Sequence, residues 1–238
     1  DGEAYDLCQA LDKLGCRRAG LLSRAGLMTP TYLKPRDRSR ADLTGEHERY
    51  DTKNRRPLQA DAEDEILARL EGLLPGIDAV IIQDQIEEVD CGVVTARVRE
   101  GLGEMARRNP KKIFWADSRC RIRLFRNITI KVNAREAVQD AFVPGRDEGD
   151  DRRVVQAIGE LRQRTGRPVF VTAGRRGIWI SDPEPSLVRG VQIPEPTDPT
   201  GAGDSVNAGC VLALCGGASL REAALVANLV GSITVQQL

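Results

Sequence analysis

The sequence predicts an α/β protein in which helices cover both faces of a mostly parallel sheet. Helical and strand patterns alternate along the chain from residue 61 onward, which is the order expected of such a fold. The central strand patterns, at 78–84, 111–117 and 168–174, are almost continuously apolar. Continuous apolar runs are typical of strands that are buried on both faces.

The first 52 residues are less regular. Residues 1–16 have apolar side chains at helical spacing, and this helical pattern ends at Gly15. Residues 17–24 indicate a short strand. Residues 28–52 are polar and interrupted by prolines. Within them, 29–34 and 48–53 predict two short, half-exposed strands joined by a loop, so this region is either a surface loop or a small β lid over a site.

The rest of the chain predicts regular elements. Helices are expected over 61–74, 91–108, 134–142, 150–166, 203–217 and 219–238, and strands over 78–84, 111–117, 127–133, 168–174, 177–182 and 186–193. Ligands of such folds bind at the carboxyl ends of the strands. The candidate stretches are therefore those that follow strands, namely 115–119, 131–137, 172–177 and 198–204.

Charge and residue counts exclude several classes of function. Lysine plus arginine equals aspartate plus glutamate, at 35 each, which gives no reason to expect nucleic acid or an anionic membrane as a partner. His47 is the single histidine, which argues against a histidine-dependent triad or a histidine-rich zinc site. No apolar run approaches the roughly 18–20 residues that cross a bilayer, and no signal peptide is visible at the start.

Six cysteines are present and none forms a CxxC pair. We expect buried, reduced thiols in a cytoplasmic protein rather than disulfides or a metal site. The cysteines are Cys8, Cys16, Cys91, Cys120, Cys210 and Cys215.

The stretch DPTGAGD at 198–204 places a carboxylate behind a loop with almost no side chains. Gly201, Ala202 and Gly203 can present backbone N–H groups at the start of a helix, where the helix dipole also favours an anion such as phosphate. Asp204 then has two interpretations. It is either an acidic residue that stabilises the first helical turn, or a general base that takes a proton from a hydroxyl as it attacks phosphorus.

The longer stretch DPTGAGDSVNAG resembles the second signature motif of the PfkB, or ribokinase-like, carbohydrate kinases. Three further stretches agree with this family in order and spacing: VNAREA with an NxxE element, VTAGRRG with a TxGxxG element, and VANLVGSITV with the closing helix. The resemblance is good from about residue 78 and looser before residue 60, where 1–15 and 28–52 resemble a helix and the lid strands. It implies a ribokinase-like three-layer α/β/α fold with a small β lid.

The resemblance implies roles for the motif residues. Asp204 would be the general base, and Gly201, Ala202 and Gly203 would form an anion hole for the transferred phosphoryl group. Glu136 with Asn133 would organise Mg²⁺ through its waters, near the phosphates of ATP. The alternative for these last two residues is a helix capping box, and both roles can coexist.

Other positions match the nucleotide-binding side of the family. Thr172, Gly174 and Gly177 would lie along the nucleotide phosphates, the alternative being an ordinary hairpin turn whose glycines have positive φ. Asn228 would lie near the adenine, the alternative being a solvent-facing or capping amide. Asp198 and Thr200 match positions where many members hold an activating K⁺, so K⁺ is an optional second ion beside ATP and Mg²⁺.

The arginines of WADSRCRIRLFR alternate, which indicates either a solvated charged face or a substrate contact by Arg119. The ADSR stretch and the lid resemble the heptose-phosphate kinases of ADP-heptose synthesis more than ribokinase. The sequence departs from the family at Val132, where proline is usual. The first strands of the family, which hold the sugar hydroxyls, and its last segment have no counterpart, so we expect 1–238 to be a single kinase domain truncated at both ends.

These observations predict an ATP-dependent kinase that phosphorylates a hydroxyl of a sugar or sugar phosphate. The alternative is a non-catalytic member of the same fold that senses a sugar or a nucleotide. An NAD-binding protein is excluded because no GxGxxG follows an early strand. The resemblance and the exposed strand edge of the lid also predict a homodimer.

Overall fold

The computed structural model describes residues 1–40, 45–138, 151–195 and 197–236. The chain divides into two compact units, each of which is described by itself. One unit comprises Asp1–Gly76 and Glu88–Val98, and the other comprises Ile77–Glu87 and Arg99–Leu238. The single domain expected from the sequence stays a prediction.

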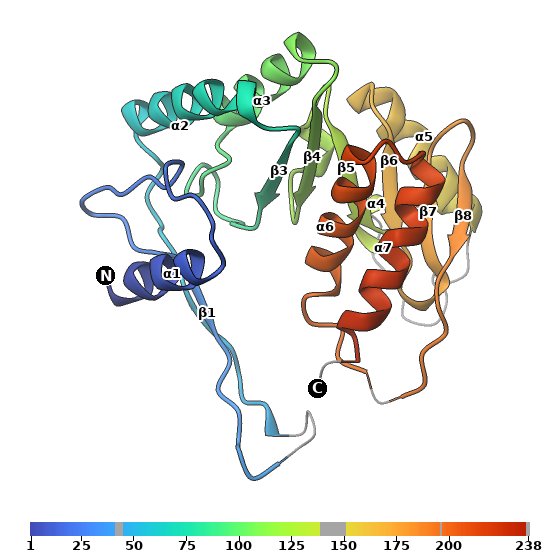
Figure 1. Ribbon diagram of the computed structural model, residues 1–238, viewed down its shortest axis with the longest axis horizontal. Coiled ribbons are helices and arrows are strands. Elements are labelled where there is room, and N and C mark those ends of the chain that lie inside the picture. Colours follow the sequence, from blue (N-terminus) through green and yellow to red (C-terminus); the bar gives the residue numbers. More distant parts are fainter. Residues whose placement is uncertain (41–44, 139–150, 196, 237–238) are drawn as a thin grey trace. The chain divides into compact units, whose positions relative to one another are not determined.

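The second unit contains a six-stranded sheet whose strands follow one another in chain order (Figure 1). The first four strands are parallel and the last two are antiparallel, so the sheet is mixed with a parallel majority, as predicted. The strands are β3 (Ala79–Asp84), β4 (Ile113–Ser118), β5 (Thr129–Asn133), β6 (Val169–Thr172), β7 (Gly177–Ile180) and β8 (Ser186–Arg189).

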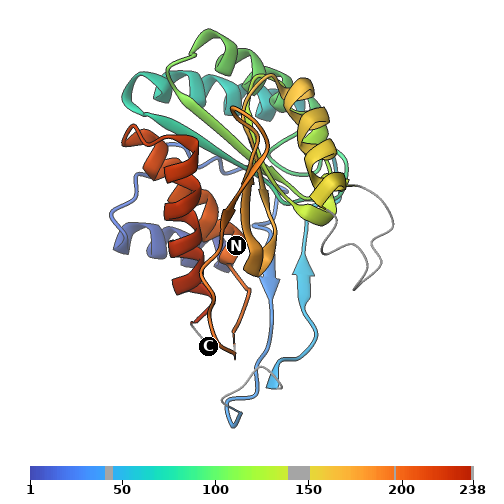
Figure 2. The same cartoon turned by 90° about the vertical axis from the view of Figure 1, so that its right-hand side faces the viewer.

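Helices cover both faces of this sheet, which confirms the α/β fold class. Figure 2 shows α6 (Ala202–Cys215) and α7 (Leu220–Thr234) on one face and α5 (Asp151–Thr165) on the other. The short α4 (Ala134–Val138) directly follows β5, and the 3-10 turns η3 (Ile122–Leu124) and η4 (Gly174–Arg176) lie in connections. The central strands are buried on both faces because helices lie on each side.

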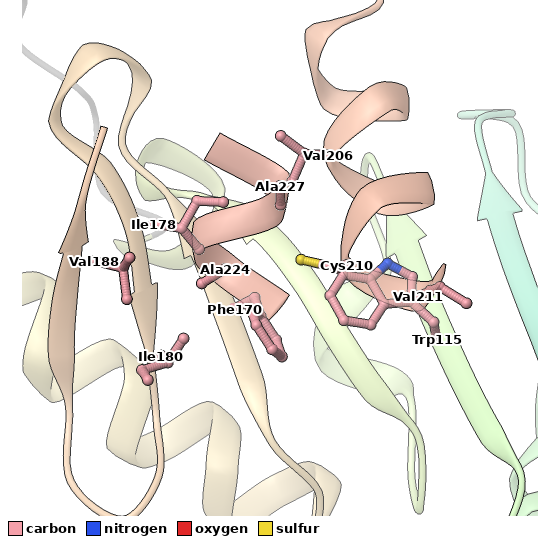
Figure 3. Close-up of a cluster of buried hydrophobic side chains, with 10 residues drawn as sticks. All are labelled: Trp115, Phe170, Ile178, Ile180, Val188, Val206, Cys210, Val211, Ala224 and Ala227. Atoms are coloured by element: carbon pink, nitrogen blue, oxygen red, sulfur yellow. The ribbon is translucent and has the colours of Figure 1, made fainter. Parts of the chain in front are cut away.

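The core between the sheet and the α6–α7 pair is built from large side chains on the strands and small ones on the helices (Figure 3). Trp115 and Phe170 are fully buried, and their ring centroids are 4.8 Å apart. Gly209 lets the two helices approach closely, because a Cβ added there would lie 3.3 Å from Cα of Ala227. Full burial of each large side chain contributes about 1.5–3 kcal/mol to folding, so this packing fixes α6 firmly against the sheet.

The first unit contains two helices and a two-stranded antiparallel sheet. Its elements are α1 (Gly2–Lys13), β1 (Thr31–Leu33), β2 (Tyr50–Thr52), α2 (Ala60–Leu73) and the turn η2 (Leu74–Gly76). The two strands predicted within 29–34 and 48–53 are confirmed and pair with each other, and their role as a lid stays a prediction. Helix α3 (Ala96–Arg108) begins in this unit and continues into the other.

Some local expectations are wrong. Residues 17–24 form no strand, because Arg69 donates hydrogen bonds to the carbonyls of Ala19 and Leu21 that a strand partner would otherwise use. The helix predicted from residue 91 begins only at Ala96, where the Thr95 hydroxyl accepts a hydrogen bond from the first turn. The last four residues of the helix predicted over 134–142 lie outside the described residues.

The prediction of buried thiols holds only in part. All six cysteines are free, but Cys210 is the one that is buried, while Cys16, Cys120 and Cys215 are exposed. The sequence did not indicate which cysteines are exposed, because cysteine appears in both apolar and polar surroundings along the chain. Within the described residues, no helix is long and apolar enough to cross a membrane.

Candidate functional site

Polar side chains gather where β3 and β4 end, next to the start of α6. Gln83 is paired with Asp117 and Asp84 with Ser118 in the parallel register of these strands. We call this region, together with the first turn of α6, the polar edge. It combines the carboxyl ends of parallel strands with a helix amino terminus, which is where ligands of α/β folds bind.

The glycine loop forms the start of α6 as expected. Gly201 is the N-cap and has φ of 76°, a left-handed conformation that glycine adopts without strain. The Thr200 N–H donates to Oδ1 of Asp198, and the Ala202 N–H donates to the Pro199 carbonyl. The Ala202 amide is therefore already engaged, and the next two amides belong to the first turn, where N–H groups have no acceptor within the helix.

Asp204 is exposed in this first turn. Its Oδ1 accepts a hydrogen bond of 3.1 Å from Nε2 of Gln83, which lies on β3. Among the described residues, its Oδ2 has no hydrogen-bond partner, and no described backbone amide donates to either oxygen. The carboxylate is thus held from the sheet rather than by its own helix, and one oxygen remains available to accept a proton.

A buried polar network lies beneath the loop. The Lys131 ammonium is 2.5 Å from Oδ2 of Asp117, and the Asn207 amide donates to the same oxygen at 2.9 Å. Oδ1 of Asn207 in turn accepts from the indole N–H of Trp115 at 2.9 Å. A Cβ added at Gly203 would lie 3.4 Å from Nζ of Lys131, so this cation lies next to the turn that precedes Asp204.

Asn133 and Glu136 form a reciprocal capping box at the start of α4. The Asn133 N–H donates to Oε2 of Glu136 at 2.9 Å, and the Glu136 N–H donates to Oδ1 of Asn133 at 2.8 Å. Burial raises the pKa of the half-buried Glu136, the Asn133 backbone bond opposes this shift, and the nearby Asp117 adds to it. The capping-box interpretation of Asn133 and Glu136 is confirmed. The role of this pair toward Mg²⁺ stays a prediction.

The donor set of Glu136 fits a water-mediated Mg²⁺ ion. Its Oε1 accepts no hydrogen bond from a described residue, so one hard oxygen remains for the water shell of the metal. No group of three or more His, Cys, Asp or Glu side chains in the described part of the chain could hold a metal directly.

Thr172, Gly174 and Gly177 lie at the tight connection between β6 and β7. Gly174 and Gly177 have φ of 55° and 110°. The Ala173 N–H donates to the Gly177 carbonyl at 2.8 Å. The hairpin interpretation is therefore confirmed, and the nucleotide role of these three residues stays a prediction.

Asn228 ties α7 to the sheet. Its amide nitrogen donates to the carbonyls of Val188 and Arg189 on β8, at 3.0 and 3.1 Å. The side chain is neither solvent-facing nor a cap, so both structural alternatives considered for it are wrong. Its expected place near an adenine stays a prediction.

The arginines that follow β4 do not form one charged face. The chain there turns through η3, and Arg121 reaches back to the carbonyls of Ile86 and Glu87 at 2.7 and 2.6 Å. Arg123 donates to the Ala137 carbonyl. Arg119, which directly follows β4, donates from Nε to Gln85 at 2.8 Å. The alternating arginines are therefore held by separate local contacts. Arg121 also reaches the polar edge, where its Nη1 lies 3.5 Å from Oδ1 of Asp84.

Sequence reasoning missed four residues of this region: Gln83, Asp117, Lys131 and Asn207. A signal was present for three of them, because a polar residue within or at the end of an apolar strand needs a buried partner or a ligand. Asn207 carried a weaker signal, since an amide within a helix is usually solvated.

The comparisons with known proteins agree with this geometry. Residues 123–238 match the model described as pfkB family carbohydrate kinase. This segment belongs to the pfkB family. The resemblance drawn from the motifs is thereby confirmed at the level of the family.

Several curated relatives of this chain carry the name bifunctional protein HldE. The protein from Wolinella succinogenes is 26% identical over 232 residues, which is 97% of this chain and 46% of that one. The protein from Caulobacter vibrioides is 28% identical over 239 residues, which is 95% of this chain and 47% of that one. The chain thus spans about half the length of these relatives.

Solved structures of sugar kinases share the fold. Ribokinase from Thermotoga maritima has a TM-score of 0.64 at 17% identity, covering 100% of this chain and 72% of that one. Escherichia coli phosphofructokinase-2 with fructose-6-phosphate has a TM-score of 0.57 at 22% identity, covering 87% and 65%. Cryptococcus neoformans ribokinase with ADP has a TM-score of 0.55 at 19% identity, covering 69% and 57%. The ribokinase-like fold predicted from the sequence is confirmed.

Proposed function

We propose that the protein is an ATP-dependent phosphotransferase that phosphorylates a hydroxyl of a sugar or sugar phosphate. The observation that carries this proposal is the placement of Asp204. Its carboxylate lies in the first turn of α6, directly behind a glycine loop, with Oδ1 held by Gln83. Such a carboxylate can accept the proton of a hydroxyl while the adjacent amides face the developing negative charge.

In this mechanism the chain mainly positions groups and stabilises charge. Asp204 takes the proton from the acceptor hydroxyl as its oxygen attacks the phosphoryl group. The amides of Gly201 and Gly203 and the positive end of α6 act as the anion hole, whereas the Ala202 N–H is engaged with the Pro199 carbonyl. The ammonium of Lys131, which is paired with Asp117, lies next to that turn and helps to hold it on the sheet. Phosphoryl transfer depends chiefly on such positioning and electrostatic stabilisation.

ATP supplies the phosphoryl group in this proposal, in line with the ADP found in the Cryptococcus ribokinase. Glu136, supported by Asn133, would hold the waters of Mg²⁺, and Thr172, Gly174, Gly177 and Asn228 would line the nucleotide side. Asp198 and Thr200 are the candidates for K⁺. Their loop is already organised by the Asp198 side chain, which accepts the Thr200 N–H.

We infer that the acceptor is a sugar phosphate rather than a free sugar. Several curated relatives are named bifunctional protein HldE, although one from Arabidopsis thaliana is named inositol 3-kinase. The phosphofructokinase-2 structure holds a sugar phosphate, fructose-6-phosphate. Arg119 supplies a cation at the carboxyl end of β4, and guanidinium groups suit phosphate recognition. Exchanging Arg119 for alanine would raise KM for a sugar phosphate and leave KM for ATP unchanged.

We also infer that the protein pairs with a second copy through its β1–β2 ribbon. A two-stranded ribbon is marginally stable alone, and Leu33 and Tyr50 on it are largely exposed. Light scattering that gives a monomer at high concentration would contradict this pairing.

The test is ADP release by the full-length protein with ATP and Mg²⁺ across a panel of sugars and sugar phosphates. We expect turnover on one acceptor and a fall of about 1000-fold or more in Asp204→Asn, which keeps the side-chain size but cannot take the proton. Turnover on no acceptor, with ATP still bound, would favour the alternative of a sugar- or nucleotide-sensing protein. Asp204 would then be a first-turn acidic residue without a catalytic role.

A further inference from the structure

We propose that Gln83 and Gln85 are positioning residues for Asp204, and that a hydrogen-bonded chain anchored at Arg119 orients its carboxylate for proton transfer. This inference rests on the proposed function, because it concerns the group that acts as base. It adds two glutamines that no motif of the sequence indicated, and it gives Arg119 a second role beside substrate contact.

Three consecutive hydrogen bonds make up this hydrogen-bonded chain. Nε of Arg119 donates to Oε1 of Gln85 at 2.8 Å, and Nε2 of Gln85 donates to Oε1 of Gln83 at 3.0 Å. Nε2 of Gln83 then donates to Oδ1 of Asp204 at 3.1 Å. All four residues belong to the same compact unit and lie at the polar edge.

The two ends of the chain fix its direction. A guanidinium group can only donate hydrogen bonds, and an ionised carboxylate can only accept them. Each amide between them therefore has one orientation, with its oxygen toward Arg119 and its nitrogen toward Asp204. Hydrogen bonds aligned in this way polarise one another, so the donor that reaches Asp204 is stronger than an isolated amide.

The hydrogen-bonded chain also favours the general-base interpretation of Asp204 over a purely helix-stabilising one. An aspartate in a first helical turn tends to bond a backbone amide of its own helix. Here no described amide does so, and Oδ1 is bonded to a strand residue instead. This arrangement leaves Oδ2 as the oxygen that can meet the acceptor hydroxyl, and it prevents the carboxylate from competing for the amides that would hold phosphate.

The side chain of Gln83 can be changed without disturbing the core. Gln83 is exposed, whereas its neighbours Ile82 and Asp84 point to the buried side of β3. Gln83→Ala removes the contact to Asp204, and Gln83→Glu replaces the donor with a second carboxylate. Gln156→Ala is a matched control, because Gln156 is an exposed glutamine on α5 that also bonds a carboxylate, that of Glu160.

The experiment measures steady-state kinetics against pH in the full-length protein with the acceptor identified above. We expect Gln83→Ala to lower kcat about 3- to 10-fold with little change in KM for ATP, as for the loss of one hydrogen bond at an exposed site. Gln83→Glu should move the acid limb of the kcat/KM profile to higher pH, because a neighbouring negative charge disfavours the ionised base. Gln156→Ala should match the unmodified protein.

A double-mutant cycle tests the chain as a unit. Gln85→Ala should lower kcat less than Gln83→Ala, and the double variant should be no slower than Gln83→Ala alone, because the first link acts through the second. Unchanged kcat and pH profile in both Gln83 variants would overturn the inference while the kinase function stands. A purely structural role would lower stability without moving the acid limb.

A structural measurement keeps the inference testable if the protein turns over no acceptor. In crystals of Gln83→Ala, we expect the Asp204 carboxylate to leave its position and bond an amide of the first turn of α6. A carboxylate that stays in place without Gln83 would overturn the inference. Failure of the kinase function and failure of the positioning role are therefore distinguishable.

Discussion

Lys131 and Asp117 form a buried ion pair beneath the glycine loop, with Nζ and Oδ2 2.5 Å apart. Both side chains are almost fully removed from solvent, and Asn207 donates to the same carboxylate oxygen. A buried pair of this kind gives little net stability, but removing one partner leaves an uncompensated charge. The pair therefore makes a strong test of how α6 is attached to the sheet.

We expect Lys131→Met to lower the free energy of unfolding by about 3–5 kcal/mol, because Asp117 would remain buried without its cation. The double variant Lys131→Met/Asp117→Asn should recover most of this loss, since it buries no charge. Urea denaturation of the two variants and the unmodified protein measures the difference. Equal stability of Lys131→Met and the unmodified protein would contradict the buried network.

The substitution Gly177→Ala tests the geometry of the tight turn between β6 and β7. A Cβ added there would lie 2.1 Å from the Val188 carbonyl oxygen and 2.4 Å from the Gly190 nitrogen, at a φ of 110°. We expect Gly177→Ala to cost about 3 kcal/mol or more in stability, through strain and displacement of β8.

Gly159 on α5 is the control for this change. A Cβ added at Gly159 meets nothing within 4 Å. Gly159→Ala should therefore stabilise the protein by about 0.5–1 kcal/mol, because alanine is the better helix former. Thermal unfolding of both variants should shift the midpoint in opposite directions, and a shift in the same direction would refute the turn geometry.

Glu136 links stability to pH. Because burial raises its pKa, the folded protein binds this proton more tightly than the unfolded chain does. Its contribution to stability is present at low pH and is lost as pH rises from the ordinary glutamate range through the raised pKa. Glu136→Gln should remove this loss and keep the cap, since glutamine can still accept the Asn133 N–H.

The same variant separates folding from catalysis. We expect Glu136→Gln to be at least as stable as the unmodified protein at pH 7, yet to need a higher Mg²⁺ concentration for half-maximal turnover. Urea denaturation at pH 4 and pH 7, together with Mg²⁺ titration of the activity, measures both effects. An unchanged Mg²⁺ dependence would restrict Glu136 to its capping role.

The cysteines provide a test of burial. Burial raises the pKa of the Cys210 thiol to about 12, and thiolate is the reactive form. Iodoacetamide at pH 8 should label the exposed Cys16 and Cys120 in the native protein within minutes and leave Cys210 unmodified. Mass spectrometry of peptides shows the labelled sites, and labelling of all six in denaturant is the control.

Much of the fold could be predicted from the sequence because its signals are local. After residue 61, the spacing of apolar residues indicates each strand and each amphipathic helix separately. The glycine loop before Asp204 indicates the start of a helix. The strand expected at 17–24 failed because a distant side chain, Arg69, takes its carbonyls. Such a contact has no local signature.

The candidate site was predictable only where motifs were contiguous. Asn133 and Glu136 are three residues apart, so the capping box could be seen directly in the sequence. Gln83 lies 121 positions from Asp204, and Lys131 contacts a carboxylate on the neighbouring strand. These contacts depend on strand order and register, which the sequence pattern alone does not specify.

The anchoring of α6 through Asn207 has a consequence for how the sequence of this protein can evolve. Asp204 and Asn207 are three positions apart and so lie on the same side of one helical turn. The turn that carries the candidate base is therefore fixed to the strands through Asn207 and Asp117, while Gln83 orients the carboxylate itself. Substitutions in residues 191–195, which precede the segment that leads into the helix, should therefore leave the carboxylate in place. Gly190 is constrained for another reason, because a Cβ there would lie 2.7 Å from the Arg175 carbonyl oxygen.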